Sequence, residues 1–349
     1  MTMYWKVDAK WPDPQIIRRA GFTLLRGGLV AFPTETVYGL GANAMDGEAV
    51  SCIFAAKGRP VDNPLIVHLE DMHKVGTVAA GISSLATALM QKFWPGPLTL
   101  VLPGAGVLPG EVTAGLDTVA VRVPDHAVAL GLIKAAGVPV AAPSANTSGS
   151  PSPTTAGHVL TDLDGKIDAV LDGGPAGVGV ESTVLDVTGK IPVILRPGGV
   201  TPSQIKAVAG AVELDPAVMV STVDEDDRPR SPGMKYRHYA PGAPLVLVEG
   251  DENKTGAMLA DLAADYGRNG RRVGVLAVTD DINLNGSVQL LKLGRKGDPR
   301  SLAANLYSAL RDFDRRGVDV IVAEGISTQG LGLAVMNRLR RAADRIIVV

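Results

Sequence analysis

Short apolar runs alternate along the chain with segments in which apolar residues recur every three or four positions. Residues 29–32 form such a run directly after two glycines, which is typical of a buried strand. Residues 13–26 instead place their apolar side chains on one face, which predicts an amphipathic helix that ends at Gly27 and Gly28. Strands that alternate with helices indicate an α/β fold.

The same alternation continues to about residue 209. Further strands are predicted at residues 65–67 and 118–123 and in the segments LTLVL, GVPVAA, IDAVLD, ESTVLDV and PVILR, and further helices up to Lys57 and over residues 82–92, 126–136 and 202–209. Between about Glu213 and Pro241 the chain becomes polar, charged and rich in proline without periodicity. This change in composition predicts a linker.

From Leu245 the alternation of apolar runs and helical segments restarts. We therefore expect a first α/β domain over residues 1–212, a linker over 213–243 and a smaller α/β domain over 244–349. The regular alternation in the last part favours a mainly parallel, Rossmann-like sheet.

The composition restricts the possible functions. Aromatic residues make up 4% of the 349 residues and the net charge is −2, which argues against stacking of single-stranded bases and against broad phosphate binding. Cys52 is the single cysteine, so no disulfide framework or thiolate metal cluster is expected. The first residues contain no stretch typical of a signal peptide, and no apolar run reaches about 18 residues. A soluble, cytoplasmic protein is expected.

The string GLGANA, residues 39–44, matches the GxGxxA pattern of dinucleotide-binding folds. Its context does not fit, because the preceding strand ends at Pro33, several residues before Gly39. We therefore interpret it as a loop with tight glycine turns. The sequence contains no P-loop pattern, HExxH motif or CxxC motif, so we expect neither a P-loop enzyme nor a metal held by the protein.

Charged and polar residues gather where predicted strands and helices end. Lys57 and Arg59 follow a helix, Asn63 lies in the next turn, and His68 follows the strand at residues 65–67. A cation pair can be only a solvated helix end, and a lone histidine can be only a packed core residue. Because these residues lie between two strand ends, where α/β sheets bind ligands, we favour a site that binds polyphosphate oxygens.

Three other strand ends carry polar groups. Ser144 and Asn146 follow one strand, Ser182 opens another, and Arg196 ends the last strand of the first domain. Each alone can be an ordinary turn. Together they indicate a site, in which no Ser-His-Asp or Cys-His arrangement stands out. Chemistry would then depend on alignment of reactants and neutralisation of charge.

The motifs that carry these residues, in their order, resemble the threonylcarbamoyl-AMP synthase family. They are PTETVYGLG, KGRPVDNPLIVH, WPGPLTLVL, TVAVRVP, PSAN, ESTV and LRPG, and the resemblance covers about Trp11 to Gly210. The linker SPGMKYRHYAP and the domain after it resemble the long form of the family. The resemblance implies a twisted, open-sheet YrdC-like catalytic domain followed by a smaller Rossmann-like α/β domain.

The resemblance also implies a reaction. L-threonine, bicarbonate or carbon dioxide, and ATP would form threonylcarbamoyl-AMP and pyrophosphate, and the adenylate would serve threonylcarbamoyladenosine modification of tRNA. A downstream tRNA-modifying transferase would be the partner, and Mg²⁺ would enter with ATP. We expect no stable nucleic-acid complex and no membrane association.

By matching position, the resemblance implies roles for individual residues. Those expected to bind L-threonine are Thr34, Thr36, His68, Arg122, Ser182 and the backbone of Ala142. Those expected to bind ATP are Lys57, Arg59, Asn63, Thr118, Ser144, Asn146, Ser152, Arg196 and Tyr236, with Lys57 and Arg59 as catalytic groups. Tyr236 would belong to a lid formed by the linker; the alternative is a linker that only docks the second domain.

Two other functions compete with this interpretation. An RNA-binding module would use a basic cleft, but the net charge and the few aromatic residues weigh against it. A carbamoyl-transfer enzyme would use a related domain, but such chains carry zinc-finger-like segments that one cysteine does not allow.

Overall fold

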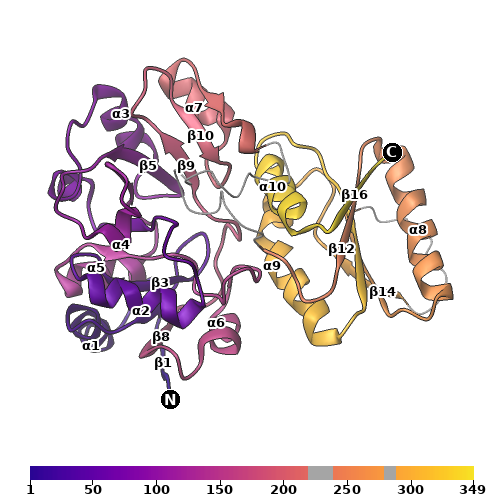
Figure 1. The fold of residues 1–349 in the computed structure, drawn as a ribbon, viewed down its shortest axis with the longest axis horizontal. Coiled ribbons are helices and arrows are strands. Elements are labelled where there is room, and N and C mark those ends of the chain that lie inside the picture. Colours follow the sequence, from indigo (N-terminus) through magenta and orange to yellow (C-terminus); the bar gives the residue numbers. More distant parts are fainter. Residues whose placement is uncertain (219–238, 279–287) are drawn as a thin grey trace. The chain divides into compact units, whose positions relative to one another are not determined.

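The computed structural model describes residues 1–218, 239–278 and 288–349. Contacts divide the chain into two compact units. The first includes Met1–Ser148 and the described residues from Ser152 to Val218, and the second includes the described residues from Tyr239 to Val349. Figure 1 shows the elements of both units.

The first unit is built on one eleven-stranded sheet in the order β1-β8-β2-β3-β7-β4-β6-β5-β9-β10-β11. Its strands are β1 Met3–Lys6, β2 Val30–Phe32, β3 Gly39–Asn43, β4 Ile66–His68, β5 Leu98–Pro103, β6 Thr118–Arg122, β7 Val140–Ala141, β8 Ala169–Asp172, β9 Thr183–Asp186, β10 Val193–Arg196 and β11 Glu213–Leu214. Parallel and antiparallel pairs are mixed: β4 is parallel to β6, whereas β5 is antiparallel to β6.

Helices lie against this sheet, with α1 packed on α5 and α3 on α7 (Figure 1). The helices are α1 Pro14–Leu25, α2 Gly47–Lys57, α3 Ser84–Phe93, α4 Gly110–Thr113, α5 Ala127–Ala136, α6 Ala156–Leu163 and α7 Pro202–Ala209, with short 3₁₀ turns η1 Met72–Thr77 and η2 Pro216–Val218. Local sequence sets their ends. The Asp46 side chain accepts from the first turn of α2, and Gly58 ends that helix in the left-handed region at φ 60°.

The central strands are buried on both faces. On one face, Val67, Leu100 and Val121 enter the main core beneath the helices. On the opposite face, Ile66, Val101, Ala120, Val184 and Leu195 form a smaller apolar cluster. This second cluster is the floor of the candidate site described below, because the polar strand ends surround it.

The structure corrects the interpretation of GLGANA. Residues 39–43 form β3 inside the sheet and are not a glycine-turn loop. A side chain at Gly41 would come within 2.9 Å of the rings and methyl groups of Phe32 and Val140, so the glycine allows close packing across the strands. The structure also contains β11 and η2 at the start of the stretch that composition marks as a linker.

The second unit is a five-stranded sheet in the order β14-β13-β15-β12-β16, in which every pair is parallel. Its strands are β12 Leu245–Glu249, β13 Val273–Ala277, β14 Val288–Lys292, β15 Val320–Glu324 and β16 Arg345–Val348, and its helices are α8 Glu252–Arg268, α9 Pro299–Arg316 and α10 Gly332–Ala342. Helix α8 covers one face, and α9 and α10 pack together on the other (Figure 1). The predicted parallel α/β sheet is confirmed.

Gly198, the second residue after β10, lies tightly against the backbone before β9, and this contact can be tested. A Cβ atom there would overlap the backbone of Glu181 and Ser182. We expect Gly198→Ala to lower the free energy of unfolding of the first domain by about 1–3 kcal/mol, because the backbone must move to make room. The measurement is urea unfolding followed by tryptophan fluorescence, since Trp5, Trp11 and Trp94 all lie in this domain.

Gly177→Ala is the matched control, because the space around a Cβ atom at Gly177 is open. Equal free energies of unfolding for the two variants would show that the backbone near Ser182 accommodates a Cβ atom at position 198.

Candidate active site

Two side chains stand next to each other at the carboxyl ends of β4 and β6. The parallel register places His68 opposite Arg122, and they are 3% and 4% exposed. Arg122 Nη2 forms an ion pair with a carboxylate oxygen of Glu35 at 2.7 Å, and Arg122 Nε donates to the carbonyl of Gly96 at 3.2 Å. A guanidinium held in this way is suited to bind a carboxylate.

His68 adds no positive charge to this pair. Its Nδ1 lies 3.2 Å from the carbonyl oxygen of Ile66, and its ring meets Phe32 edge to face. Burial, together with the nearby charge of Arg122, lowers the pKa of His68 to about 3. The imidazole is therefore neutral near pH 7, and Arg122 carries the positive charge at this strand edge.

The loop between β2 and β3 carries two buried hydroxyls. Thr34 Oγ1 and Thr36 Oγ1 lie 2.8 Å apart. The loop is fixed from the far side, because the carbonyls of Glu35 and Thr36 accept hydrogen bonds from the backbone of Val178 at 2.7 Å and Gly179 at 3.1 Å. These hydroxyls are held in place before any ligand arrives.

The end of α2 is joined to the PSAN loop through Lys57. This side chain is 2% exposed, and its ammonium donates to the carbonyls of Ser144 and of Asn146, the latter at 2.5 Å. Ser144 Oγ in turn donates to Asn146 Oδ1 at 2.5 Å. Lys57 therefore holds the loop that carries two of the residues expected to bind ATP.

Arg59 and Asn63 lie in the turn that follows. Arg59 Nη2 donates to the carbonyls of Asn63 at 3.2 Å and Pro64 at 3.4 Å. Asn63 is almost fully buried, and its Oδ1 has no hydrogen-bond partner among the described residues. A buried amide oxygen without a partner is costly, which indicates that a ligand group donates to it.

Ser182 connects β9 to the neighbouring strands. Its Oγ lies 2.8 Å from Thr99 Oγ1 and accepts from Arg196 Nη2 at 3.3 Å. Arg196 also donates twice to the Ser182 carbonyl. The residue before Ser182, Glu181, accepts at Oε1 from Ser152 Oγ at 2.5 Å. Both predicted serines are therefore buried and hydrogen-bonded.

Thr118 lies at the other end of the same face. Thr118, Ala120 and Arg122 alternate along β6 and share the face of the apolar floor. Four residue steps separate Thr118 from Arg122, which is about 13 Å in a strand. The backbone of Ala142 is joined to the floor, since its N–H donates to the carbonyl of Ile66 at 2.9 Å.

The contacts join the predicted site residues in smaller groups: Thr34 with Thr36, His68 with Arg122, Lys57 with Ser144 and Asn146, Arg59 with Asn63, and Arg196 with Ser182. Tyr236 lies outside the described residues. Sequence reasoning missed Glu35, Thr99 and Glu181, which contact Arg122, Ser182 and Ser152. Glu35 and Glu181 stand inside the PTET and ESTV motifs, so a charged residue next to expected ligand groups was the available signal.

The described residues contain no group of three His, Cys, Asp or Glu side chains that could hold a metal ion. None of the helices in the described residues combines the length and the apolar character that a membrane crossing needs.

Two family models match the chain. A model of the family described as telomere recombination matches residues 23–198. A second model, described as threonylcarbamoyl-AMP synthase, C-terminal domain, matches residues 200–344. Together the two models span both units of the structure.

Curated relatives match along the whole chain. A threonylcarbamoyl-AMP synthase of Bacillus subtilis is 49% identical over 98% of both chains, and one of Pyrococcus abyssi is 50% identical over 100% of both. The crystal structure of P. abyssi Sua5 complexed with L-threonine superposes with a TM-score of 0.93 at 49% identity and 100% coverage of both chains. With two family models and full-length relatives in agreement, the chain belongs to the threonylcarbamoyl-AMP synthase family.

Proposed function

We propose that the first domain forms threonylcarbamoyl-AMP from L-threonine, bicarbonate or carbon dioxide, and ATP, with release of pyrophosphate. Family membership makes the chain an enzyme, a transferase that makes an AMP intermediate. The observation that carries the choice of substrates is the buried Arg122 at the edge of a hydroxyl-rich loop, with Lys57, Arg59 and Arg196 farther along the same site.

The chemistry needs alignment more than a protein nucleophile. The threonine nitrogen, once deprotonated, attacks the carbon of carbon dioxide, and the N–C bond forms a carbamate. A carbamate oxygen then attacks the α-phosphorus of ATP, the bond to the bridging oxygen of the β-phosphate breaks, and pyrophosphate leaves with that electron pair. Fixed cations around the phosphates stabilise the charge that develops on the leaving group.

Threonine would bind at the Arg122 end. Its carboxylate replaces the Glu35 carboxylate on Arg122, while Thr34, Thr36, neutral His68, Ser182 and the backbone of Ala142 surround the rest of the molecule. Glu35 is then free to face the threonine ammonium. The relative from P. abyssi has been crystallised with L-threonine, which supports an amino-acid site in this domain.

ATP would lie along the floor toward Thr118. Arg59 and Arg196 would contact the phosphates, and Asn63 Oδ1 would accept from a hydroxyl or amino group of the nucleotide. Ser144, Asn146 and Ser152 would line the nucleotide, and Lys57 would hold the PSAN loop as well as the phosphate charge. Mg²⁺ would arrive bound to the phosphates, which supply the oxygen ligands it prefers. The adenylate would pass to a transferase that modifies tRNA in the cytoplasm.

The direct test is to incubate the full chain with labelled L-threonine, bicarbonate and Mg·ATP. We expect one threonylcarbamoyl-AMP for each pyrophosphate. Release of pyrophosphate without threonine, or labelled threonine that never reaches the adenylate, would reject the proposed reaction.

The two cations after α2 should differ when they are removed. We expect Arg59→Ala to lower kcat/KM for ATP, by an amount that corresponds to about 2–4 kcal/mol of lost transition-state stabilisation. The melting temperature should change little, because half-buried Arg59 acts mainly on phosphate charge. Lys57→Ala should lower both kcat/KM for ATP and the melting temperature, since the buried ammonium of Lys57 also donates to two backbone carbonyls. Pyrophosphate release and thermal melting measure the two effects.

Exposed Lys92→Ala is the matched control for a lost positive charge. An Arg59→Ala enzyme with wild-type pyrophosphate release would remove Arg59 from the catalytic groups.

Glu35 should matter for threonine and not for ATP. We expect Glu35→Gln to raise KM for threonine about tenfold, because a mostly buried contact between the carboxylate and the ammonium is lost. KM for ATP should change less than twofold. Exposed Glu48→Gln controls for the change in net charge. An unchanged KM for threonine in Glu35→Gln would show that Glu35 does not contact the threonine ammonium.

The buried His68 should make stability depend on pH. Its folded pKa of about 3 lies below the unfolded value near 6.5, so the unfolded chain binds the proton first and stability falls as pH drops below about 6.5. Between pH 7 and pH 5 this loss amounts to at most about 2 kcal/mol. His68→Gln should reduce it, measured by urea unfolding with tryptophan fluorescence.

Burial also lowers the pKa of His126, so some pH dependence should remain in the variant. Exposed His73→Gln should keep the wild-type dependence. A His68→Gln protein that loses as much stability as the wild type between pH 7 and pH 5 would contradict a neutral, buried His68.

A further inference from the structure

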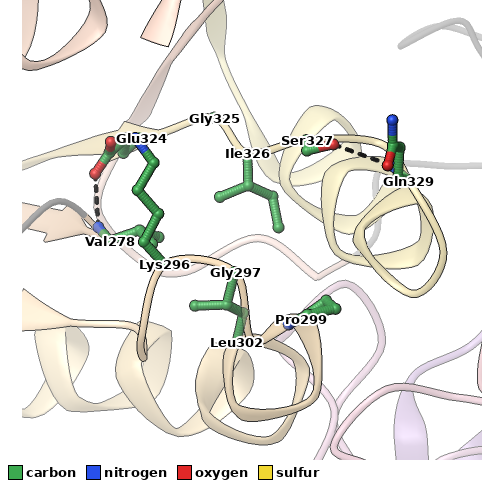
Figure 2. Close-up of a pocket in the computed structure, with 10 residues that line it drawn as sticks. All are labelled: Val278, Lys296, Gly297, Pro299, Leu302, Glu324, Gly325, Ile326, Ser327 and Gln329. Carbon is green, nitrogen blue, oxygen red and sulfur yellow. Dashed lines mark hydrogen bonds between the residues drawn. The ribbon is translucent and has the colours of Figure 1, made fainter. Parts of the chain in front are cut away.

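The second domain contains a cavity of about 330 Å³ at the carboxyl edge of its parallel sheet. Figure 2 shows the cavity and the residues that line it. Its walls come from the residue after β13, from the turn between β14 and α9 with the first turn of α9, and from the end of β15 with the loop that follows it.

The topology places this cavity at the switch point of the sheet. From β13 the chain moves outward to β14, whereas from β15 it moves the opposite way, past β12, to β16. Because β13 and β15 are neighbours and the strands that follow them lie on opposite sides, the strand order reverses between them. Open α/β sheets bind ligands at such a reversal.

The fold itself fixes one wall of the cavity. The loop that builds one wall is fixed to the sheet, since the N–H of Gly325 donates to the carbonyl of Val248 at 2.7 Å. A Cβ atom at Gly325 would come within 2.8 Å of Glu249, so this wall lies tightly against β12. Preformed concave sites of this size are typical of small-molecule binding.

The charges disfavour a phosphate. Glu324 is mostly buried at the end of β15, and its Oε2 accepts from the N–H of Val278 at 2.6 Å. The Lys296 side chain extends toward this carboxylate in Figure 2. The amino end of α9 is already capped, because Asp298 accepts from the N–H groups of Arg300 and Ser301. A phosphate there would meet the Glu324 carboxylate and a helix end whose N–H groups at Arg300 and Ser301 already have a partner.

The remaining lining is apolar in the middle and polar at both ends. Ile326 points toward Gly297 and Leu302 on the opposite wall (Figure 2). Glu324 and Lys296 stand at one end, and Ser327 and Gln329 stand at the other, where the backbone N–H of Gln329 donates to Ser327 Oγ at 3.3 Å. A flat molecule with hydrogen-bond donors at one end matches this arrangement.

We propose that this cavity binds a nucleoside without its phosphates. The ribose hydroxyls donate to the Glu324 carboxylate, which has acceptor sites beyond the one used by Val278. The base lies between Ile326 and Leu302, and its edge meets the amide of Gln329. The site belongs entirely to the second domain and is separate from the ATP site proposed for the first.

The test measures adenosine binding to the full-length chain by calorimetry. We expect Ile326→Trp, which fills the cavity, to weaken binding at least about tenfold, and exposed Gln329→Ala to weaken it severalfold without risk to folding. Adenosine lacking both ribose hydroxyls should bind about tenfold more weakly than adenosine. Arg59→Ala, in the first domain, should leave the affinity unchanged.

Adenylate formation by Ile326→Trp and Gln329→Ala should equal that of the wild type, which shows that both variants are folded and separates this proposal from the proposed reaction. Absence of adenosine binding up to about 1 mM would overturn the proposal. Binding that survives both cavity variants would overturn it too, since the adenosine would then occupy another site. So would equal affinity for adenosine and for its form without ribose hydroxyls.

Discussion

The register between β4 and β6 is the constraint on which the first domain's site depends. It puts His68 opposite Arg122 at one sheet edge. Burial removes the charge from the histidine, so Arg122 faces Glu35 as the cation at this edge. A shift of one residue would turn both side chains to the opposite face, into the main apolar core. Strand pairing therefore determines the electrostatics of the site as well as its shape.

The buried cations of the first domain have partners within the protein. Glu35 pairs with Arg122, and backbone carbonyls accept from Lys57 and Arg196. These contacts offset the cost of burying positive charges. A substrate carboxylate or phosphate would then exchange one partner for another, so little free energy is lost to reorganisation when it binds. This arrangement suits a reaction in which alignment and charge neutralisation do most of the work.

Much of the fold follows from local sequence, and the rest depends on neighbours. Periodicity predicted α1, α5 and α7 closely, and it predicted the parallel second domain, because one apolar face or run defines each element. It failed at β3, since Gly39 and Gly41 favour turns locally and become a strand only between Phe32 and Val140. The roles of the site residues rest on motif resemblance, which did not include Glu35, because only the folded loop brings its carboxylate to Arg122.

The two sheets position their sites by different means. In the first domain mixed strand directions bring loops from both sides of the sheet around an apolar floor, so hydrogen bonds between distant segments must hold each loop, as Thr36 and Gly179 show. In the second domain all strands run the same way, and the crevice between β13 and β15 results from topology alone. Its chemistry depends on the Glu324 carboxylate at the end of β15. A neutral ligand with donors is therefore the natural occupant there, whereas anionic substrates belong to the first domain.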